Sequence, residues 1–143
     1  MQYISPPSYT KPVSLEMESH WAETILTMHE NARVNLNYPN ERPTYDFSLR
    51  SANAVALADV EKNHISINRI LAELNHTEEF VSASVANEIA HLINQERYGD
   101  LESFISWGKI VRSLGETPNK TRYKAAGHNN HGHGVMPFVS IKQ

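Results

Sequence analysis

Hydrophobic positions along this chain change their period twice, and the changes divide it into helical and extended parts. After Ser14 apolar side chains recur at a spacing close to 3.6 residues, as on one face of a helix, and they are Trp21, Ile25, Met28 and Ala32. Ser14 is a typical N-cap, and Pro39 and Pro43 mark the exit from the helix. The pattern therefore predicts an amphipathic helix that begins after Ser14.

Between Thr44 and Ile70 the period falls to two, which is typical of strands with one buried face. Three short runs show it: Tyr45, Phe47 and Leu49; Val55 and Leu57; and Ile65 and Ile67 between polar neighbours. Residues 51–53 and 61–63 have the composition of turns. Because short loops join three consecutive strands, we expect an antiparallel meander.

Helical spacing returns after Thr77 and predicts two further helices. The first has Thr77 as N-cap and Gly99 at its C-terminal end, and its apolar stripe is Val81, Val85, Ile89, Leu92 and Ile93. The second is expected from about Leu101 to Leu114, with Gly115 and Pro118 beyond its end. Its inward residues are Phe104, Trp107, Ile110, Val111 and Leu114. A helix, a meander and two helices make an α+β fold.

Composition places the chain among globular proteins. Of its 143 residues 40 % are hydrophobic and 20 % charged, as expected for one domain with a buried core. No apolar run approaches the ~18 residues that a membrane span needs, and no secretory signal is visible. The absence of cysteine excludes disulfides, thiol catalysis and cysteine-based zinc sites, and fits a reducing compartment. We therefore expect a cytoplasmic protein without a membrane partner.

Three segments and a weak basic cluster complete the outline. Residues 1–13 contain three prolines and predict an extended arm, residues 14–123 the folded domain, and residues 124–143 a tail rich in His, Gly and Asn. The net charge of -3 argues against strong nonspecific binding of nucleic acid. Nucleic acid is kept as a second kind of partner, and the cations that would contact it are Lys109, Arg112, Lys120, Arg122 and Lys124.

Candidate chemistry lies in the middle of the helix predicted for residues 78–98. There Asn87 and His91 stand one turn apart on the same face, with Glu88 beside them. With histidine at both ends the segment would be a zincin site, in which two imidazoles hold Zn²⁺ and the glutamate activates the bound water. A neutral amide oxygen such as that of Asn87 is a weak zinc ligand.

The chain around this segment resembles the SprT-like domain of zinc metalloproteases, a family that includes the Spartan-type DNA–protein crosslink proteases. The resemblance covers the Leu-Asn-Tyr-Pro segment at 36–39, the hairpin at 58–68, the metal-binding helix at 80–99 and the closing helix and turn at 107–121. It implies a minimal zincin-like fold and a zinc-dependent peptidase activity.

The same resemblance implies that two of three zinc ligands are missing. The family pattern has histidine where Asn87 stands, and a third histidine four residues before the helix tryptophan, where this chain has Ser103. His91 remains as a metal ligand, and Glu88 occupies the place of the general base. A threonine–histidine pair of the family is Thr121-Arg122 here, and the cysteine-rich zinc ribbon of many members is missing.

Two interpretations of this site remain open. In the first, His91 is hydrogen-bonded to Asn87 or Glu88, Glu88 is vestigial and no cofactor is needed. In the second, His91 binds zinc together with tail histidines, and Glu88 acts as base. The spacing of the tail histidines can chelate a transition metal, although such tracts also bind nickel or zinc adventitiously, and these residues are His128, His131 and His133.

We therefore expect a catalytically inactive SprT-like domain that binds a protein partner, with a nucleoprotein complex as one setting. Zincin clefts accept peptides as an added strand at the sheet edge, and this mode does not need the metal. The compact size and the lost ligands suit a phage or mobile-element protein, which would act in the host cytoplasm. The alternative is a metallopeptidase with rebuilt zinc ligation.

Overall fold

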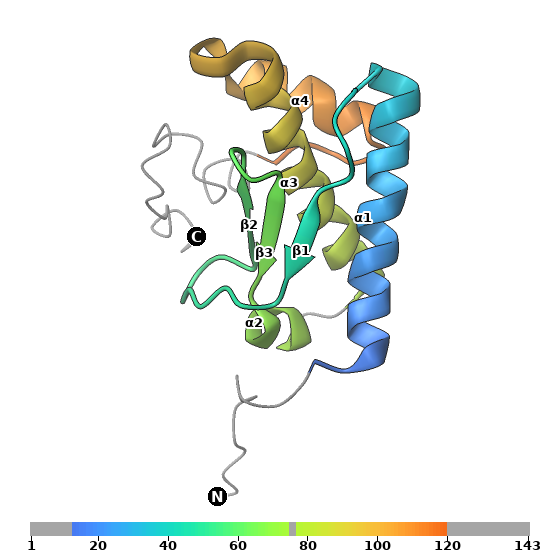
Figure 1. Cartoon of the computed structure of the whole chain (residues 1–143), viewed down its shortest axis with the longest axis vertical. Helices are drawn as coiled ribbons and strands as arrows, with labels where there is room; N and C mark the ends of the chain where they lie inside the picture. Colours follow the sequence, from blue (N-terminus) through green and yellow to red (C-terminus); the bar gives the residue numbers. More distant parts are fainter. Residues whose placement is uncertain (1–12, 75–76, 120–143) are drawn as a thin grey trace, which may run out of the picture.

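A computed structural model describes residues 13–74 and 77–119 of the chain. These residues form a mixed α+β structure of four α-helices and one three-stranded sheet (Figure 1). The order is α1 (Leu15–Leu36), β1 (Thr44–Asp46), β2 (Ala56–Asp59), β3 (His64–Ile67), α2 (Arg69–Leu74), α3 (Glu78–Tyr98), the 3-10 turn η1 (Gly99–Leu101) and α4 (Phe104–Ser113). The α+β prediction is confirmed at this level.

Helix α1 forms as its sequence predicts. The Ser14 side chain accepts a hydrogen bond from the Met17 backbone N–H, which satisfies one of the free donors of the first turn. The helix ends at Asn37, which adopts a left-handed conformation with φ 54°, as asparagine does more readily than most residues. The predicted apolar face is buried, and its members are Met17, Trp21, Ile25, Met28 and Ala32.

The sheet has the predicted number of strands but a different topology. Its order is β1-β3-β2, with β1 parallel to β3 and β2 antiparallel to β3 (Figure 1). The predicted antiparallel meander is therefore wrong. A tight turn, in which Asn63 has φ 51°, joins β2 to β3, whereas residues 47–55 form a longer connection that carries the chain across β3 to the opposite edge.

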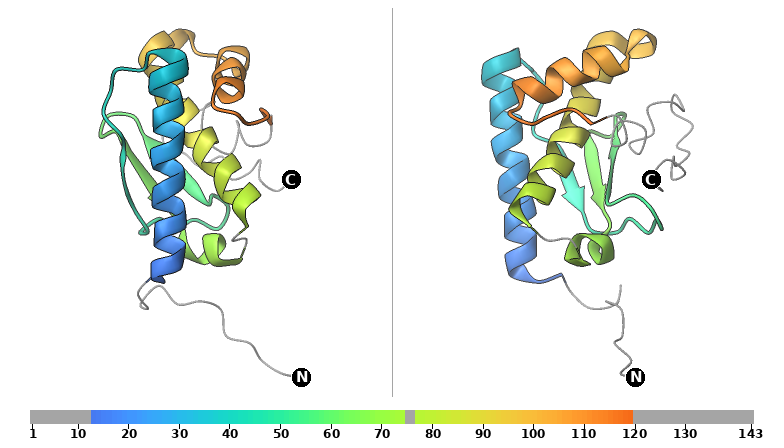
Figure 2. Two further views of the ribbon diagram at one scale, coloured as in Figure 1. Left: turned by 90° about the vertical axis from the view of Figure 1, so that its right-hand side faces the viewer. Right: turned by 180° about the vertical axis from the view of Figure 1, so that it is seen from behind.

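Helix α3 is the central element of the fold. The Thr77 side chain accepts a hydrogen bond from Phe80 N–H, and Gly99 ends the helix at φ 53°, so both predicted ends are confirmed. Between residues 84 and 94 every residue of α3 is buried, because α1, β2 and α4 all pack against it. Figure 2 shows α1 and α3 on the same side of the sheet.

Two helical details differ from the predictions. The short helix α2 was not predicted, because its six residues give too few turns for a periodic signal. Helix α4 begins at Phe104 rather than at Leu101, since Ser103 is its N-cap and η1 precedes it. The C-terminal end of α4 is held against α1 by hydrogen bonds from Asn31 to the Leu114 carbonyl and from Asn35 to the Ser113 carbonyl.

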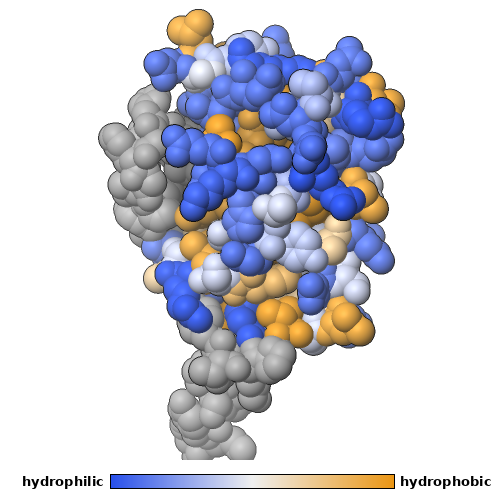
Figure 3. Space-filling view, viewed as in Figure 1, coloured by the Kyte–Doolittle hydropathy of each residue, from blue (hydrophilic) through white to orange (hydrophobic). Residues whose placement is uncertain are grey.

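One hydrophobic core joins all these elements. Its largest fully buried side chains come from α1, β3, α3 and α4, and include Trp21, Ile25, Ile65, Ile67, Ile89, Ile93, Trp107 and Leu114. The face that carries the sheet in Figure 1 is mostly polar, with separate apolar patches (Figure 3). None of the helices in the described ranges is long and apolar enough to cross a membrane.

Candidate functional site on helix α3

Asn87, Glu88 and His91 are all buried in the middle of α3. Their exposed fractions are 5 %, 3 % and 9 %. Ionisable residues are rarely buried to this extent unless they are paired or hydrogen-bonded. Their contacts therefore show what this part of the helix does.

The Glu88 carboxylate joins α3 to strand β2. Its Oε1 accepts a hydrogen bond of 2.9 Å from the Ala58 backbone N–H, and its Oε2 accepts one of 2.8 Å from Asn87 Nδ2. Both oxygens are thus held by donors of the fold, and both bonds involve a charged acceptor, which makes them stronger than neutral ones. Glu88 fixes the position of β2 relative to the helix.

The bond to Ala58 lies on the open edge of β2, which we define as the outward backbone groups of Ala56 and Ala58. The Asn68 N–H bonds to the Val55 carbonyl across the β2–β3 pair at 2.7 Å. In an antiparallel ladder, inward and outward residues alternate. Leu57 pairs with Ser66, so its backbone N–H and C=O point toward β3. The backbone groups of Ala56 and Ala58 therefore point outward.

Asn87 supplies acceptors on two sides. Its backbone carbonyl accepts a hydrogen bond of 3.3 Å from Trp107 Nε1, which docks α4 onto α3. Its side-chain Nδ2 donates to Glu88, and its Oδ1 is buried without a hydrogen-bond partner among residues 13–74 and 77–119. The carboxamide cannot be reversed, because that would bring two oxygens together. Oδ1 is therefore an acceptor that a ligand could use.

His91 is held in its neutral form by burial. Desolvation lowers its pKa from the ordinary 6.5 to about 4, so the imidazole is uncharged at pH 7. A neutral imidazole can act as a metal ligand or as a hydrogen-bonding group. Burial makes it a poor proton acceptor at neutral pH.

Ser103 is placed at the end of the same helix face. Asn87, His91 and Asn94 follow each other at i, i+4 and i+7 and share one face of α3. Asn94 Nδ2 donates to the Ser103 carbonyl at 3.5 Å and to Glu102 Oε1 at 2.9 Å. The Ser103 hydroxyl itself accepts from Ser106 N–H in a capping box.

The buried Asn94 was missed by sequence reasoning. It is fully buried, and its Oδ1 also accepts a hydrogen bond of 2.7 Å from the Ser106 hydroxyl. Together these bonds fix the start of α4 against α3. An asparagine within the apolar stripe of a helix was the available signal, because a buried amide needs polar partners.

The described residues alone do not provide a complete set of zinc ligands. A zinc site needs three or four imidazole, thiolate or carboxylate ligands, and in residues 13–74 and 77–119 no three His, Cys, Asp or Glu side chains come together. His128, His131 and His133 lie outside the described residues. The alternative that uses them remains a prediction.

The predicted nucleic-acid contacts are only partly covered. Lys109 and Arg112 lie on α4, three residues apart, and both are exposed. Lys120, Arg122 and Lys124 lie outside the described residues, so the cluster as a whole is not placed. Two exposed cations on one helix are typical of an ordinary solvated surface.

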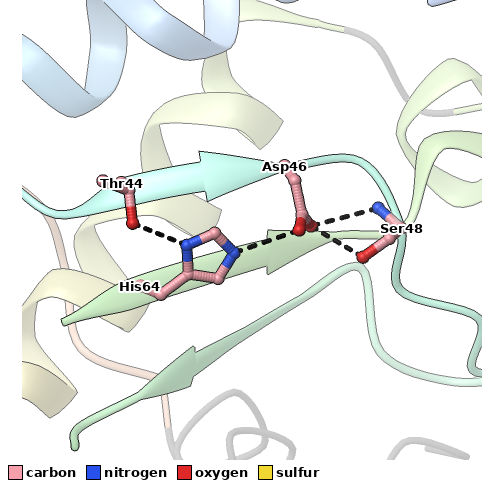
Figure 4. A network of polar contacts seen from close by, with 4 residues as sticks. All are labelled: Thr44, Asp46, Ser48 and His64. Carbon is pink, nitrogen blue, oxygen red and sulfur yellow. Dashed lines mark hydrogen bonds and ion pairs between the residues drawn. The ribbon is translucent and has the colours of Figure 1, made fainter. Parts of the chain in front are cut away.

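A second polar cluster connects β1 to β3 (Figure 4). The His64 ring contacts Thr44 Oγ1 with Nδ1 at 2.7 Å and Asp46 Oδ2 with Nε2 at 3.3 Å. Asp46 Oδ1 also accepts hydrogen bonds from the Ser48 N–H and hydroxyl. Burial alone would raise the pKa of Asp46, but the Ser48 bonds and His64 lower it. These contacts stabilise the pairing of β1, a strand of only three residues, with the rest of the sheet.

Comparison with known proteins gives related sequences. The chain is 31 % identical over 98 residues to Protein SprT of Pseudomonas putida (strain GB-1), and 30 % to that of Pseudomonas putida (strain W619). It is 29 % identical to Protein SprT of Pseudomonas entomophila (strain L48). Each alignment covers 67 % of this chain and 58 % of the relative. A scan of family models and a search of solved structures found no match.

These similarities support a SprT-like relationship over two thirds of the chain, and the chain spans less than two thirds of its curated relatives.

Proposed function

We propose that this chain is a SprT-like domain without peptidase activity, and that it binds a partner protein as an extended strand along the open edge of β2. The observation that carries the proposal is the pair of hydrogen bonds at Glu88. The carboxylate that would activate water in a peptidase accepts Ala58 N–H on one oxygen and Asn87 Nδ2 on the other. These bonds give Glu88 a structural role in holding β2.

The ligand positions support the same conclusion. Asn87 offers a neutral amide where the family has an imidazole, and Ser103 is committed to capping α4. Of the three expected ligands, the described residues retain His91 alone, whose pKa of about 4 keeps it neutral.

The sheet offers two edges, and β2 is the better candidate for pairing. The edge strand β1 is fastened by the His64 cluster and carries charged and polar side chains, which discourage pairing. Strand β2 has alanine at both outward positions, and neither carries a charge that would discourage pairing; since the Ala58 N–H already bonds to Glu88, a partner strand is left with the Ala56 N–H and the outward carbonyls. It also lies directly against α3, where the family resemblance places the binding cleft.

Strand addition can be tested with peptides methylated on alternate backbone nitrogens. Decapeptides are first selected from a displayed random library with the purified full chain. The best peptide is then made in two forms, one N-methylated at odd positions and one at even positions. One form blocks the hydrogen bonds toward β2 and should bind at least ~10-fold more weakly, whereas the other should change by less than ~3-fold.

The variant Ala56→Pro tests the same edge from the protein side. Proline removes the outward N–H of Ala56, and edge strands tolerate proline at such positions. We expect a loss of peptide affinity without loss of the helical circular dichroism signal. Equal affinity for the two methylated forms would overturn strand addition, whether or not this variant folds.

Metal content separates the proposal from the peptidase alternative. The untagged full chain is dialysed, and zinc is measured by mass spectrometry and by anomalous scattering at the zinc edge. We expect far less than one zinc per chain. Stoichiometric zinc bound through His91, together with cleavage of a protein substrate that Glu88→Gln abolishes, would establish the peptidase.

A further inference from the structure

We infer that the buried pair formed by Asn87 and Glu88 receives the ammonium group of a lysine carried by the strand that adds to β2; this inference rests on the proposed function. It names the chemistry of the partner segment: an extended segment with lysine at one fixed position. Asn87 offers an acceptor for which the described residues supply no hydrogen-bond donor.

Asn87 Oδ1 is that acceptor. Its residue is 95 % buried, since only 5 % is exposed, and the oxygen has no hydrogen-bond partner. A buried acceptor without a partner is energetically unfavourable, so it favours a ligand that brings a donor. The direction of the carboxamide is fixed, because its Nδ2 donates to Glu88 Oε2 at 2.8 Å.

The carboxylate beside this acceptor determines the charge of the donor. Oδ1 and Nδ2 belong to one planar amide, so Oδ1 lies near the Glu88 carboxylate that Nδ2 contacts. An acceptor next to an anionic group selects a cationic donor over a neutral one. The chain as a whole carries a net charge of -3, which also favours a basic partner.

The existing hydrogen bonds favour lysine over arginine. Arginine binds carboxylates best through two parallel N–H groups, but one oxygen of Glu88 already accepts Ala58 N–H and the other accepts Asn87 Nδ2. An ammonium is a compact donor and needs only one direction of approach. The long apolar stem of lysine can lie along a buried path while its end reaches the acceptors.

The position of the pair links it to the strand-binding edge. Glu88 contacts Ala58 N–H, which is one of the outward groups of β2. A peptide paired with β2 therefore lies beside the strand to which Glu88, and through it Asn87, is hydrogen-bonded. In a strand, alternate side chains point to the same face, so a single peptide position is directed toward the helix.

The test uses the selected decapeptide with an acetylated N-terminus, which removes the terminal amine as a source of charge. Lysine at the enriched position is replaced by norleucine or acetyl-lysine, and affinities are measured by calorimetry in the presence of a chelator. With the wild-type chain we expect each replacement to weaken binding by ~10-fold. Replacement of other lysines should have little effect.

The variant Glu88→Gln provides the decisive comparison. Glutamine can still accept Ala58 N–H through Oε1, and its amide N–H can donate to Asn87 Oδ1 after that carboxamide turns. The site would then lose both its charge and its unused acceptor. We expect the lysine-to-norleucine effect to fall to less than ~2-fold, and this ratio of two affinities on the same variant is the readout, whatever the variant does to the affinity for either peptide alone.

The matched control is Glu79→Gln, which removes the same charge from an exposed position in the first turn of α3. It should keep the ~10-fold lysine effect. An unchanged lysine effect in Glu88→Gln, or selected peptides that show no lysine preference, would overturn this inference. In either case the methylated peptides still report on strand addition, so failure here is distinct from failure of the proposed function.

Discussion

At the scale of single residues, the middle of α3 is polar where close packing on all sides would favour apolar side chains. Five polar or charged residues are buried there, and they are Ser84, Asn87, Glu88, His91 and Asn94. Glu88 connects the helix to β2, and Asn94 connects it to the cap of α4. Burial of Glu88 and Asn94 is tolerable because their side chains have hydrogen-bond partners within the fold.

The stability of the chain should depend on pH through His91. Burial lowers its folded-state pKa to about 4, whereas the unfolded value is 6.5. Between these values the unfolded chain binds more protons, so the free energy of unfolding falls as pH falls. We expect a loss of about 2 kcal/mol between pH 7 and pH 5 from this residue, measured by urea unfolding with a chelator present.

The variant His91→Gln isolates this effect. It has no titrating group at the position, so its stability should change much less over the same pH interval, even if it is less stable at every pH. Asp46 and Glu30 also have lowered pKa values, but they lose their stabilising effect only at more acidic pH. Parallel curves for the variant and the wild type would contradict the assignment.

At the scale of elements, the local signals in the sequence were sufficient for the N-termini of α1 and α3, each of which has a side-chain cap. Ser14 and Thr77 cap their helices as predicted, because a hydroxyl that accepts the N3 amide is a short-range interaction. The start of α4 was misplaced by three residues. Ser103 was read as a lost ligand position, and its suitability as an N-cap was overlooked.

Two glycines should respond oppositely to substitution by alanine. Gly99 ends α3 with φ 53° and ψ -123°, a conformation that strains other residues, so Gly99→Ala should cost about 1–3 kcal/mol although no atom lies within 4 Å of the added Cβ. Gly108 is inside α4, and an added Cβ would lie 3.5 Å from Pro118 Cβ, an ordinary contact.

Gly108→Ala should therefore stabilise the chain by about 0.5–1 kcal/mol, through higher helix propensity and a less flexible unfolded chain. Chemical unfolding of both variants gives the comparison. A destabilised Gly108→Ala together with an unaffected Gly99→Ala would contradict both the ordinary contact at Gly108 and the positive φ of Gly99.

At the scale of the whole molecule, alternation indicated which residues form strands but not which strands are neighbours. Ile65 and Ile67 are fully buried, as their alternation predicts. Their strand lies in the centre of the sheet because it pairs with β1 on one side and β2 on the other. That arrangement depends on long-range pairing between strands, about which local periodicity holds no information.

For the candidate site, too, the sequence predicted the local spacing of the residues but not their long-range contacts. The spacing of Asn87, Glu88 and His91 placed them on one turn of a buried helix, which is confirmed. Their partners were not predictable, because Ala58 and Trp107 come from distant parts of the chain and contribute backbone and indole groups that carry no sequence signature. The contact between α3 and α4 leads to a last prediction about the molecule as a whole.

If the family resemblance is correct, histidines at two positions on different helices should rebuild a zinc site with His91. Asn87 lies one turn before His91, and Ser103 lies at the end of the same face through its contact with Asn94. The double variant Asn87→His/Ser103→His should bind zinc stoichiometrically, whereas each single variant should bind at least ~10-fold more weakly. The effect should be non-additive, because three ligands are needed together.

Calorimetry with zinc measures this, and Ser103→Ala serves as the control for the loss of the α4 cap, which costs about 1 kcal/mol by itself. A folded double variant that binds zinc no better than Asn87→His alone would show that Ser103 is not the third position. Recovery of zinc without any gain of peptidase activity would still agree with a domain whose Glu88 is engaged by β2, because a general base must be able to reach the metal-bound water.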